Sequence, residues 1–115
     1  MKLYGVRIWV DDMDAARRFY GETLGLELDW DFGAAAGYRL GGPQLIVEQG
    51  DGSHESEGLV GRFVGCSIAV DDIDLAYRDL AAKGVTFLAP PEKQPWGGVL
   101  AHFRDPAGNV LTLLA

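Results

Sequence analysis

An α+β fold made of two β-α-β-β-β modules is predicted by three features of this 115-residue chain. Residues 5–14 (GVRIWVDDMD) recur sixty positions later as residues 65–74 (GCSIAVDDID). Apolar residues at helical spacing follow each copy, and each helical pattern stops at a glycine, Gly25 or Gly84. Segments in which apolar and polar residues alternate, typical of half-buried strands, fill the rest of each half. We therefore predict one domain, 1–115, with module one at 1–49, a linker at 50–61, module two at 62–115, and a cupped eight-stranded mixed sheet with helices outside.

The order of elements is similar in the two modules. Module one is predicted to contain a strand at 4–10, a helix at 13–24, a strand at 26–32, a break at 33–37, and a hairpin of 38–40 and 44–49 across a Gly-Gly-Pro turn. Module two is predicted to contain a strand at 63–70, a helix from 73 that stops at Gly84, a strand at 85–88, a loop at 89–95, and a hairpin of 98–104 and 109–114. The aspartates before the two helices are interpreted as N-caps rather than as a carboxylate cluster: Asp11, Asp12, Asp71 and Asp72.

Composition and charge exclude several kinds of function. The chain is 48% hydrophobic with a formal net charge of −7, so it lacks the positive field that nucleic-acid binding requires. No apolar run approaches the about 20 residues that span a bilayer, and the N-terminus lacks a signal-peptide pattern. We therefore expect a cytoplasmic protein with neither a nucleic acid nor a membrane as partner. The single cysteine, Cys66, excludes an intrachain disulfide.

The strand pattern separates an apolar face of the predicted sheet from a mixed face. The apolar face, which includes Val6, Ile8 and Val10, should pack under the helices, and Cys66 on the same face is interpreted as a small buried hydrophobe. The mixed face should line a concave surface, because strongly twisted sheets coil. We expect the ligand on this face, whose residues are Arg7, Trp9, Gln44, Ile46, Glu48, Ser67, Ala69, Leu100, His102, Val110 and Thr112.

Aromatic, charged and hydrogen-bonding side chains are the candidates for ligand contact. Trp9 and Trp96 would stack on a planar ligand, and Arg7 and Glu48 would make charge contacts with it. Trp30 is interpreted as a packing residue, because it shares the parity of the leucines in its strand. The predicted ligand-binding set is Arg7, Trp9, Ile46, Glu48, Ser67, Trp96, Leu100, His102 and Thr112.

Glu48 and His102 are the residues of the mixed face that can exchange protons near neutral pH. In one interpretation they act as base and acid in a catalysed reaction. In the other, Glu48 pairs with Arg7, and His102 hydrogen-bonds Thr112 across the closing hairpin. His54, in the acidic linker, is expected to be exposed to solvent.

Three features of the sequence resemble the vicinal oxygen chelate superfamily, which includes glyoxalase I, fosfomycin-resistance enzymes, extradiol dioxygenases and bleomycin-resistance proteins. They are the Val-Asp-Asp-hydrophobic-Asp segment before each helix, Arg18-Phe19-Tyr20, and Phe103-Arg104-Asp105-Pro106-Ala107-Gly108-Asn109. The resemblance covers nearly the whole chain and implies the glyoxalase/bleomycin resistance/dioxygenase fold. It also implies a homodimer, because small members usually dimerise and exposed edge strands need covering.

Metal-dependent members have four ligand positions, and the resemblance carries them to Gly5, Glu48, Gly65 and Thr112. Glycine has no ligating side chain, and one carboxylate cannot hold a divalent cation against its water shell. We therefore expect no metal and no cofactor. Trp96-Gly97-Gly98 is similar to a segment of the metal-free bleomycin-resistance branch, whose members bind a drug without transforming it.

The predicted function is metal-free binding of a planar or charged small molecule, such as an antibiotic, in a cup between the two modules. One alternative is a lyase or isomerase of the glyoxalase type, in which Glu48 and His102 transfer protons. Another is a module that only assembles with a second protein, with Trp9 filling the cup. The sequence leaves open whether the protein is an enzyme.

Overall fold

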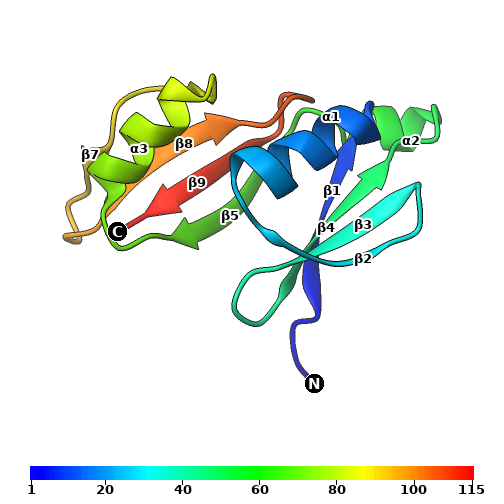
Figure 1. Ribbon diagram of the computed structural model, residues 1–115, viewed down its shortest axis with the longest axis horizontal. Coiled ribbons are helices and arrows are strands. Elements are labelled where there is room, and N and C mark those ends of the chain that lie inside the picture. The colour runs from blue at the N-terminus through cyan, green and yellow to red at the C-terminus, as the bar shows by residue number, and fades with distance from the viewer.

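The strands are divided between two sheets in the computed structural model, which describes residues 1–115 (Figure 1). The first sheet has the order β1-β4-β3-β2, with β1 at Gly5–Val10, β2 at Glu27–Asp31, β3 at Ala35–Arg39 and β4 at Gln44–Gln49. The second has the order β5-β9-β8-β6, with β5 at Phe63–Ala69, β6 at Thr86–Phe87, β8 at Val99–Arg104 and β9 at Val110–Leu114, and a short β7 at Glu92–Lys93 pairs with β8. In each sheet the first strand of the module runs parallel to its last strand, and the other pairs are antiparallel. The α+β class and the paired modules are confirmed.

Two helices follow the repeated Val-Asp-Asp segments, as predicted. In module one, α1 (Met13–Arg17) continues as the π-helix η1 (Arg18–Thr23), and in module two α3 spans Ile73–Ala82. Asp12 caps α1 by accepting from the Ala15 N–H at 3.0 Å, and Asp72 caps α3 by accepting from the Leu75 N–H at 3.1 Å. Only the second aspartate of each pair is the N-cap, so the prediction that Asp11 and Asp71 also cap was wrong.

The structure differs from the prediction in how segments are grouped and where they begin. The strands form two sheets of four and five strands rather than one eight-stranded sheet. The predicted break after β2 is shorter, because β3 already begins at Ala35. The linker is not all loop: it contains a short helix, α2 (His54–Glu57), and Val60 forms an isolated bridge with Trp9. His54 is exposed, as expected.

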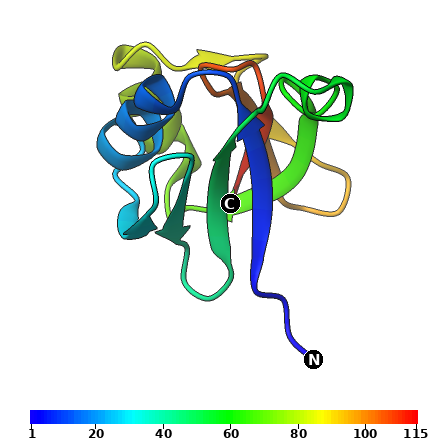
Figure 2. The ribbon, with the colours of Figure 1, turned by 90° about the vertical axis from the view of Figure 1, so that its right-hand side faces the viewer.

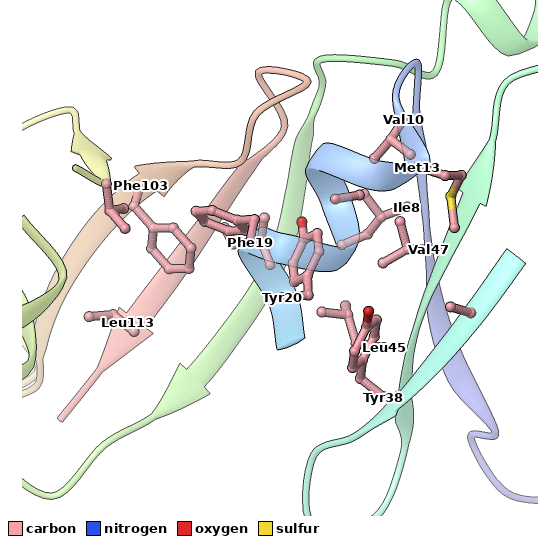
Figure 3. Packing of buried hydrophobic residues seen from close by; sticks show 14 of the residues in the cluster. Ile8, Val10, Met13, Phe19, Tyr20, Tyr38, Leu45, Val47, Phe103 and Leu113 are labelled. Atoms are coloured by element: carbon pink, nitrogen blue, oxygen red, sulfur yellow. The ribbon is translucent and has the colours of Figure 1, made fainter. Parts of the chain in front are cut away.

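A hydrophobic cluster joins the two modules, and the helix of module one lies at its centre (Figure 3). Phe19 points toward Phe103 of the second sheet, with ring centroids 6.2 Å apart. Tyr20, on the same helix, faces Tyr38 of the first sheet at 6.1 Å. Because all four rings are buried, η1 packs between the two sheets rather than on one of them.

The inner faces of the two equivalent edge strands differ in burial. In β1 the exposed fraction of Ile8 is 0%, whereas its repeat equivalent in β5, Ile68, is only half-buried. Cys66 is also half-buried: it packs against the core as a small apolar residue, but one side of it lines a hollow, and burial raises the pKa of its thiol. The N-terminal residues project beyond β1 (Figure 2). No helix has the length and apolarity that crossing a bilayer requires.

Candidate functional site

The helices cover one side of the first sheet, and the other side is open. Strand register places Arg7, Ile46 and Gly37 in one row across β1, β4 and β3, and Trp9, Glu48 and Ala35 in the next row. Side chains in these rows point away from the core residues, because neighbours along a strand alternate between faces. We call this surface the open face of the first sheet, and its residues are Arg7, Trp9, Trp30, Ala35, Gly37, Arg39, Gln44, Ile46 and Glu48.

Trp30 lies on the open face because a bulge in β2 changes its parity. Leu28 is paired with Tyr38, and Trp30 with Gly37. Between these two pairs β2 advances by two residues while β3 advances by one, which is a β-bulge in β2. The indole N–H of Trp30 donates to the Gln44 side-chain oxygen at 2.7 Å. The prediction that Trp30 has the same parity as the leucines was therefore wrong. No local pattern predicted the bulge, although a glycine within a strand is typical of a bulge or of a place where another group closely approaches the backbone.

Phe32 extends the aromatic part of the open face. Its ring centroid lies 5.4 Å from that of Trp30, and the side chain is 83% exposed. Ala35 and Gly37, the smallest residues of the open face, lie in the strand beside them. Gly37 is covered by the Trp30 ring, so the surface on which a flat ligand can stack consists of the Trp30 and Phe32 rings and the small Ala35 beside them. Sequence analysis did not select Phe32.

Arg7 and Glu48 form an ion pair on the open face. The Arg7 Nε and one terminal nitrogen donate to the two Glu48 carboxylate oxygens at 2.5 and 3.0 Å. Hydrogen bonding to Glu48 and the charge of that carboxylate raise the pKa of Arg7 above its ordinary value. The Arg7 guanidinium also lies over the Trp9 ring, 4.8 Å from its centroid. Trp9 is therefore already in contact with a cation on a face that a ligand would use for stacking.

The second sheet also has a face turned away from the helices, with His102 at its centre. His102 Nδ1 is 2.7 Å from the Thr112 hydroxyl oxygen, which confirms the hydrogen-bonding interpretation for this pair. The ring of Phe63, which sequence analysis did not select, lies edge-on to His102 at 5.8 Å. Ser67 pairs with Thr112 in the neighbouring strand, and Leu100 lies in β8 with His102.

Trp96 lies in the loop between β7 and β8, apart from both groups. It is 66% exposed, and its ring lies so close to Gly98 that a β-carbon there would be 2.0 Å from it. Gly98 is therefore required for the observed position of the ring. The indole remains accessible, as a ligand contact requires.

The predicted site residues do not surround one cavity within the chain. Glu48 is engaged by Arg7 in the first sheet and His102 by Thr112 in the second, and no contact joins Glu48 to His102. Among the predicted ligand-binding residues, only Ser67 lines one of the main hollows, with a volume of about 320 Å³. That hollow lies between the modules and also includes Val6, Gln44 and Cys66.

The junction of the modules is fixed by Asn109, which was predicted only as the first residue of the last strand. Its side-chain N–H groups donate to the Trp9 carbonyl at 2.8 Å and to the Asp105 carboxylate at 3.0 Å. Its side-chain oxygen accepts from the main-chain N–H groups of Gly61 and Arg62 at 2.9 and 3.1 Å. The closing hairpin therefore holds both the end of β1 and the start of module two beside the open face.

The comparison with known proteins agrees with this architecture. A family model for the Glyoxalase/Bleomycin resistance protein/Dioxygenase superfamily matches residues 3–113. The chain belongs to this superfamily. Two relatives from Bacillus subtilis (strain 168), the uncharacterized proteins YraH and YurT, are 29% and 33% identical to it, covering 98% and 99% of this chain and 97% and 98% of their own lengths. A crystal structure of a superfamily member from Sphaerobacter thermophilus superposes with a TM-score of 0.87 at 30% identity, covering 99% of this chain and 96% of the other.

The four positions that the resemblance assigns to metal ligands in this superfamily do not form a donor set in this member. A β-carbon at Gly5 would lie 2.7 Å from the main-chain oxygen of Gln44, and Gly65 has a φ of +72°, which disfavours any other residue. The Thr112 hydroxyl is within hydrogen-bonding distance of His102, and Glu48 is paired with Arg7. Nowhere in the structure do three His, Cys, Asp or Glu side chains come together as a metal ion would need. The residues present therefore do not fit a divalent cation at this place.

Proposed function

We propose that the protein binds a planar small molecule on the open face of its first sheet and sequesters it without a metal or cofactor. The observation that carries the proposal is the accessible aromatic pair of Trp30 and Phe32. Phe32 is 83% exposed next to Trp30, whose ring covers Gly37, and the small Ala35 lies in the adjacent strand. A flat ring placed against that pair gains stacking contacts and removes apolar surface from water.

The polar residues of the open face support a role in orienting the ligand. The Arg7 guanidinium is 59% exposed, so it can still hydrogen-bond a ligand while it pairs with Glu48. Ile46, between Arg7 and Gly37 in the same row, is only 8% exposed, so it supports the open face from below and offers a ligand little surface. Trp96 and the group around His102, which are separate from this face within one chain, would contact the ligand only if another surface closes over it.

A homodimer in the cytoplasm is part of the proposal, with each site shared between two copies. Two features support it: the apolar side chains of β5 are only half-buried, and the faces of the two sheets that carry the predicted site residues are separate within one chain. A second copy that covers these surfaces would remove apolar area from water and protect the edge strands. Light scattering during size-exclusion chromatography would measure the mass of the particle. A monomer that binds ligand at full affinity would exclude shared sites.

The enzymatic alternative has less support from the geometry. Glu48 and His102 have separate partners in separate sheets, and proton transfer by the pair needs both within reach of one substrate. Glu48→Gln is the direct test. If the protein acts as a lyase or isomerase through Glu48, this variant loses turnover, whereas for a sequestering protein every bound compound is recovered chemically unchanged from wild type.

The binding proposal is tested by titrating a panel of planar compounds, including planar antibiotics, and following tryptophan fluorescence and thermal shift. We expect Trp30→Ala to weaken binding by about tenfold, because stacking and edge contacts of an aromatic pair contribute about 0.5–1.5 kcal/mol beyond the buried area. Leu75→Ala, at an exposed apolar residue of α3, is the matched control and should bind as wild type does. Equal affinities of wild type and Trp30→Ala for every bound compound would move the site away from the open face.

A further inference from the structure

Arg62 lies at the β1 border of the open face, where module two begins. One of its terminal nitrogens donates to the Arg7 main-chain oxygen at 2.7 Å. Its guanidinium carbon is 6.0 Å from the centroid of the Trp9 ring, and the Arg7 guanidinium carbon is 4.8 Å from the same centroid. The two arginines therefore lie beside one indole, although they are far apart in the sequence.

The charge of Arg62 is not balanced by the protein. Each of the other arginines on the open face has a carboxylate partner: Arg7 pairs with Glu48, and Arg39 pairs with Glu27 and Asp29. Arg62 takes part in no salt bridge, and its Nε is buried without a hydrogen-bond partner. Removing part of a guanidinium from water without a counter-charge costs free energy, and an anion nearby offsets that cost.

The main chain holds Arg62 in place before any ligand arrives. Its N–H donates to the Asn109 side-chain oxygen at 3.1 Å, and its carbonyl accepts from the Val110 N–H at 2.9 Å. A binding group that is already fixed loses little conformational entropy when it meets its ligand. The protein has a net charge of −7. An arginine that has no carboxylate partner and is held beside an aromatic ring therefore favours anionic over cationic ligands at this place.

From these observations we infer that Arg62 binds the acidic group of the ligand, so that the ligand is a planar aromatic anion, such as an aromatic carboxylate or sulfonate. The inference rests on the proposed function, since it names the ligand class for the same open face. The anionic group lies at the β1 border beside Arg62 and Trp9, and the ring extends from there across the open face toward β4 and β3. Only a longer ligand also reaches Trp30 and Phe32 at the β2 side of the sheet. Arg7 does not take this role, because the Glu48 carboxylate already balances its charge, although its remaining N–H groups can still donate to a ligand.

Three probes with the same ring system test the inference: 2-naphthoate, 2-naphthalenemethanol and 2-naphthylmethylammonium. Wild type should bind the anion about tenfold more tightly than the cation, since a hydrogen bond to a charged group is worth roughly that much. Arg62→Gln should remove this preference and leave binding of the neutral alcohol unchanged. Arg62→Lys should keep the preference for the anion, because the positive charge remains. Arg78→Gln, which removes an exposed positive charge from α3, is the matched control and should behave as wild type.

The outcomes separate this inference from the proposed function. The assignment of Arg62 is wrong if the neutral alcohol binds wild type as tightly as the anion does. It is also wrong if Arg62→Gln still prefers the anion. In both cases the open face remains a binding site. If none of the three probes binds, the assignment of Arg62 fails, and the panel of planar compounds with Trp30→Ala decides separately whether the open face is a binding site. If Arg62→Gln does not fold, the affinities of wild type and Arg62→Lys are measured at low and at high salt. The inference requires that 2-naphthoate binds more weakly at high salt and that the neutral alcohol does not. Equal salt dependence for the two probes overturns it.

Discussion

At Gly37, the missing side chain is what allows Trp30 to lie across the first sheet. A β-carbon there would be 2.3 Å from the indole nitrogen and 2.8 Å from the Gln44 side-chain oxygen, the two atoms that hydrogen-bond each other. The glycine therefore maintains both the ring position and its hydrogen bond. It also lets the ring lie against the sheet, in the position that the proposed site uses.

Gly37→Ala is expected to displace the Trp30 indole and to break its bond to Gln44. The free energy of unfolding should fall by about 1–3 kcal/mol, the usual cost of overpacking, and the planar compound that wild type binds should bind more weakly. Gly42→Ala is the matched control, because a β-carbon at Gly42 would have no atom within 4 Å. Urea unfolding and fluorescence titration measure the two effects, and a Gly37→Ala protein that binds normally would contradict this role.

Among the elements, the turn between β8 and β9 connects the two modules through hydrogen bonds. Asp105 is buried, accepts from the Ala107 and Asn109 N–H groups at 3.0 and 2.8 Å, and accepts from the Tyr20 hydroxyl at 2.7 Å. Asn109 links the same turn to Trp9 and to the start of β5. One hairpin therefore positions the helix of module one, the end of β1 and Arg62 together.

Asn109→Ala should destabilise the fold by about 3–5 kcal/mol, because the fully buried Asn109 amide bonds main-chain groups of Gly61, Arg62 and Trp9 and the buried Asp105 carboxylate, and all four would lose a partner. Gln49→Ala removes an exposed amide that also donates to a main-chain oxygen, that of Asp11 at 2.9 Å, and it should cost less than about 1 kcal/mol. Chemical denaturation of the two variants gives the comparison. Equal decreases in the free energy of unfolding for the two variants would mean that the turn does not hold the modules together.

At the scale of the whole molecule, the two modules share one core through the helix of module one. Tyr20 is completely buried against Tyr38 of the first sheet, and its hydroxyl bonds Asp105 beside the second sheet. Burial first, and then the nearby Asp105 carboxylate, raise the pKa of Tyr20 well above its ordinary value of 10.0. Its neutral form is thus favoured in the folded state.

Stability is therefore expected to decline as the pH rises above 10, where Tyr20 ionises in the unfolded chain and remains neutral in the fold. The contribution of neutral Tyr20 to the free energy of unfolding is complete below that pH and is lost above it. Burial also raises the pKa of Tyr38, so this residue acts in the same direction. Tyr20→Phe should lose about 1–2 kcal/mol at neutral pH with its hydrogen bond, and its Tm should depend less steeply on alkaline pH. Calorimetry of wild type should show one transition, and a Tyr20→Phe slope equal to that of wild type would refute the linkage.

Local patterns in the sequence were enough to determine the two modules, their strands and the capping aspartates. The repeat, the alternation of apolar residues and the Asp12 and Asp72 caps depend on neighbours along the chain, so they can be read without a structure. The same patterns proposed the Arg7–Glu48 and His102–Thr112 pairs as one of two interpretations, and the structure contains both pairs.

Tertiary structure alone decided which residues share the candidate site. A single bulge moved Trp30 to the open face, and bulges arise from pairing between strands rather than from the period within one strand. Arg62 reaches Trp9 only because the closing hairpin brings the start of module two to the end of β1. Such contacts join residues that are distant in the chain, and their geometry depends on how whole elements pack, which no local pattern encodes.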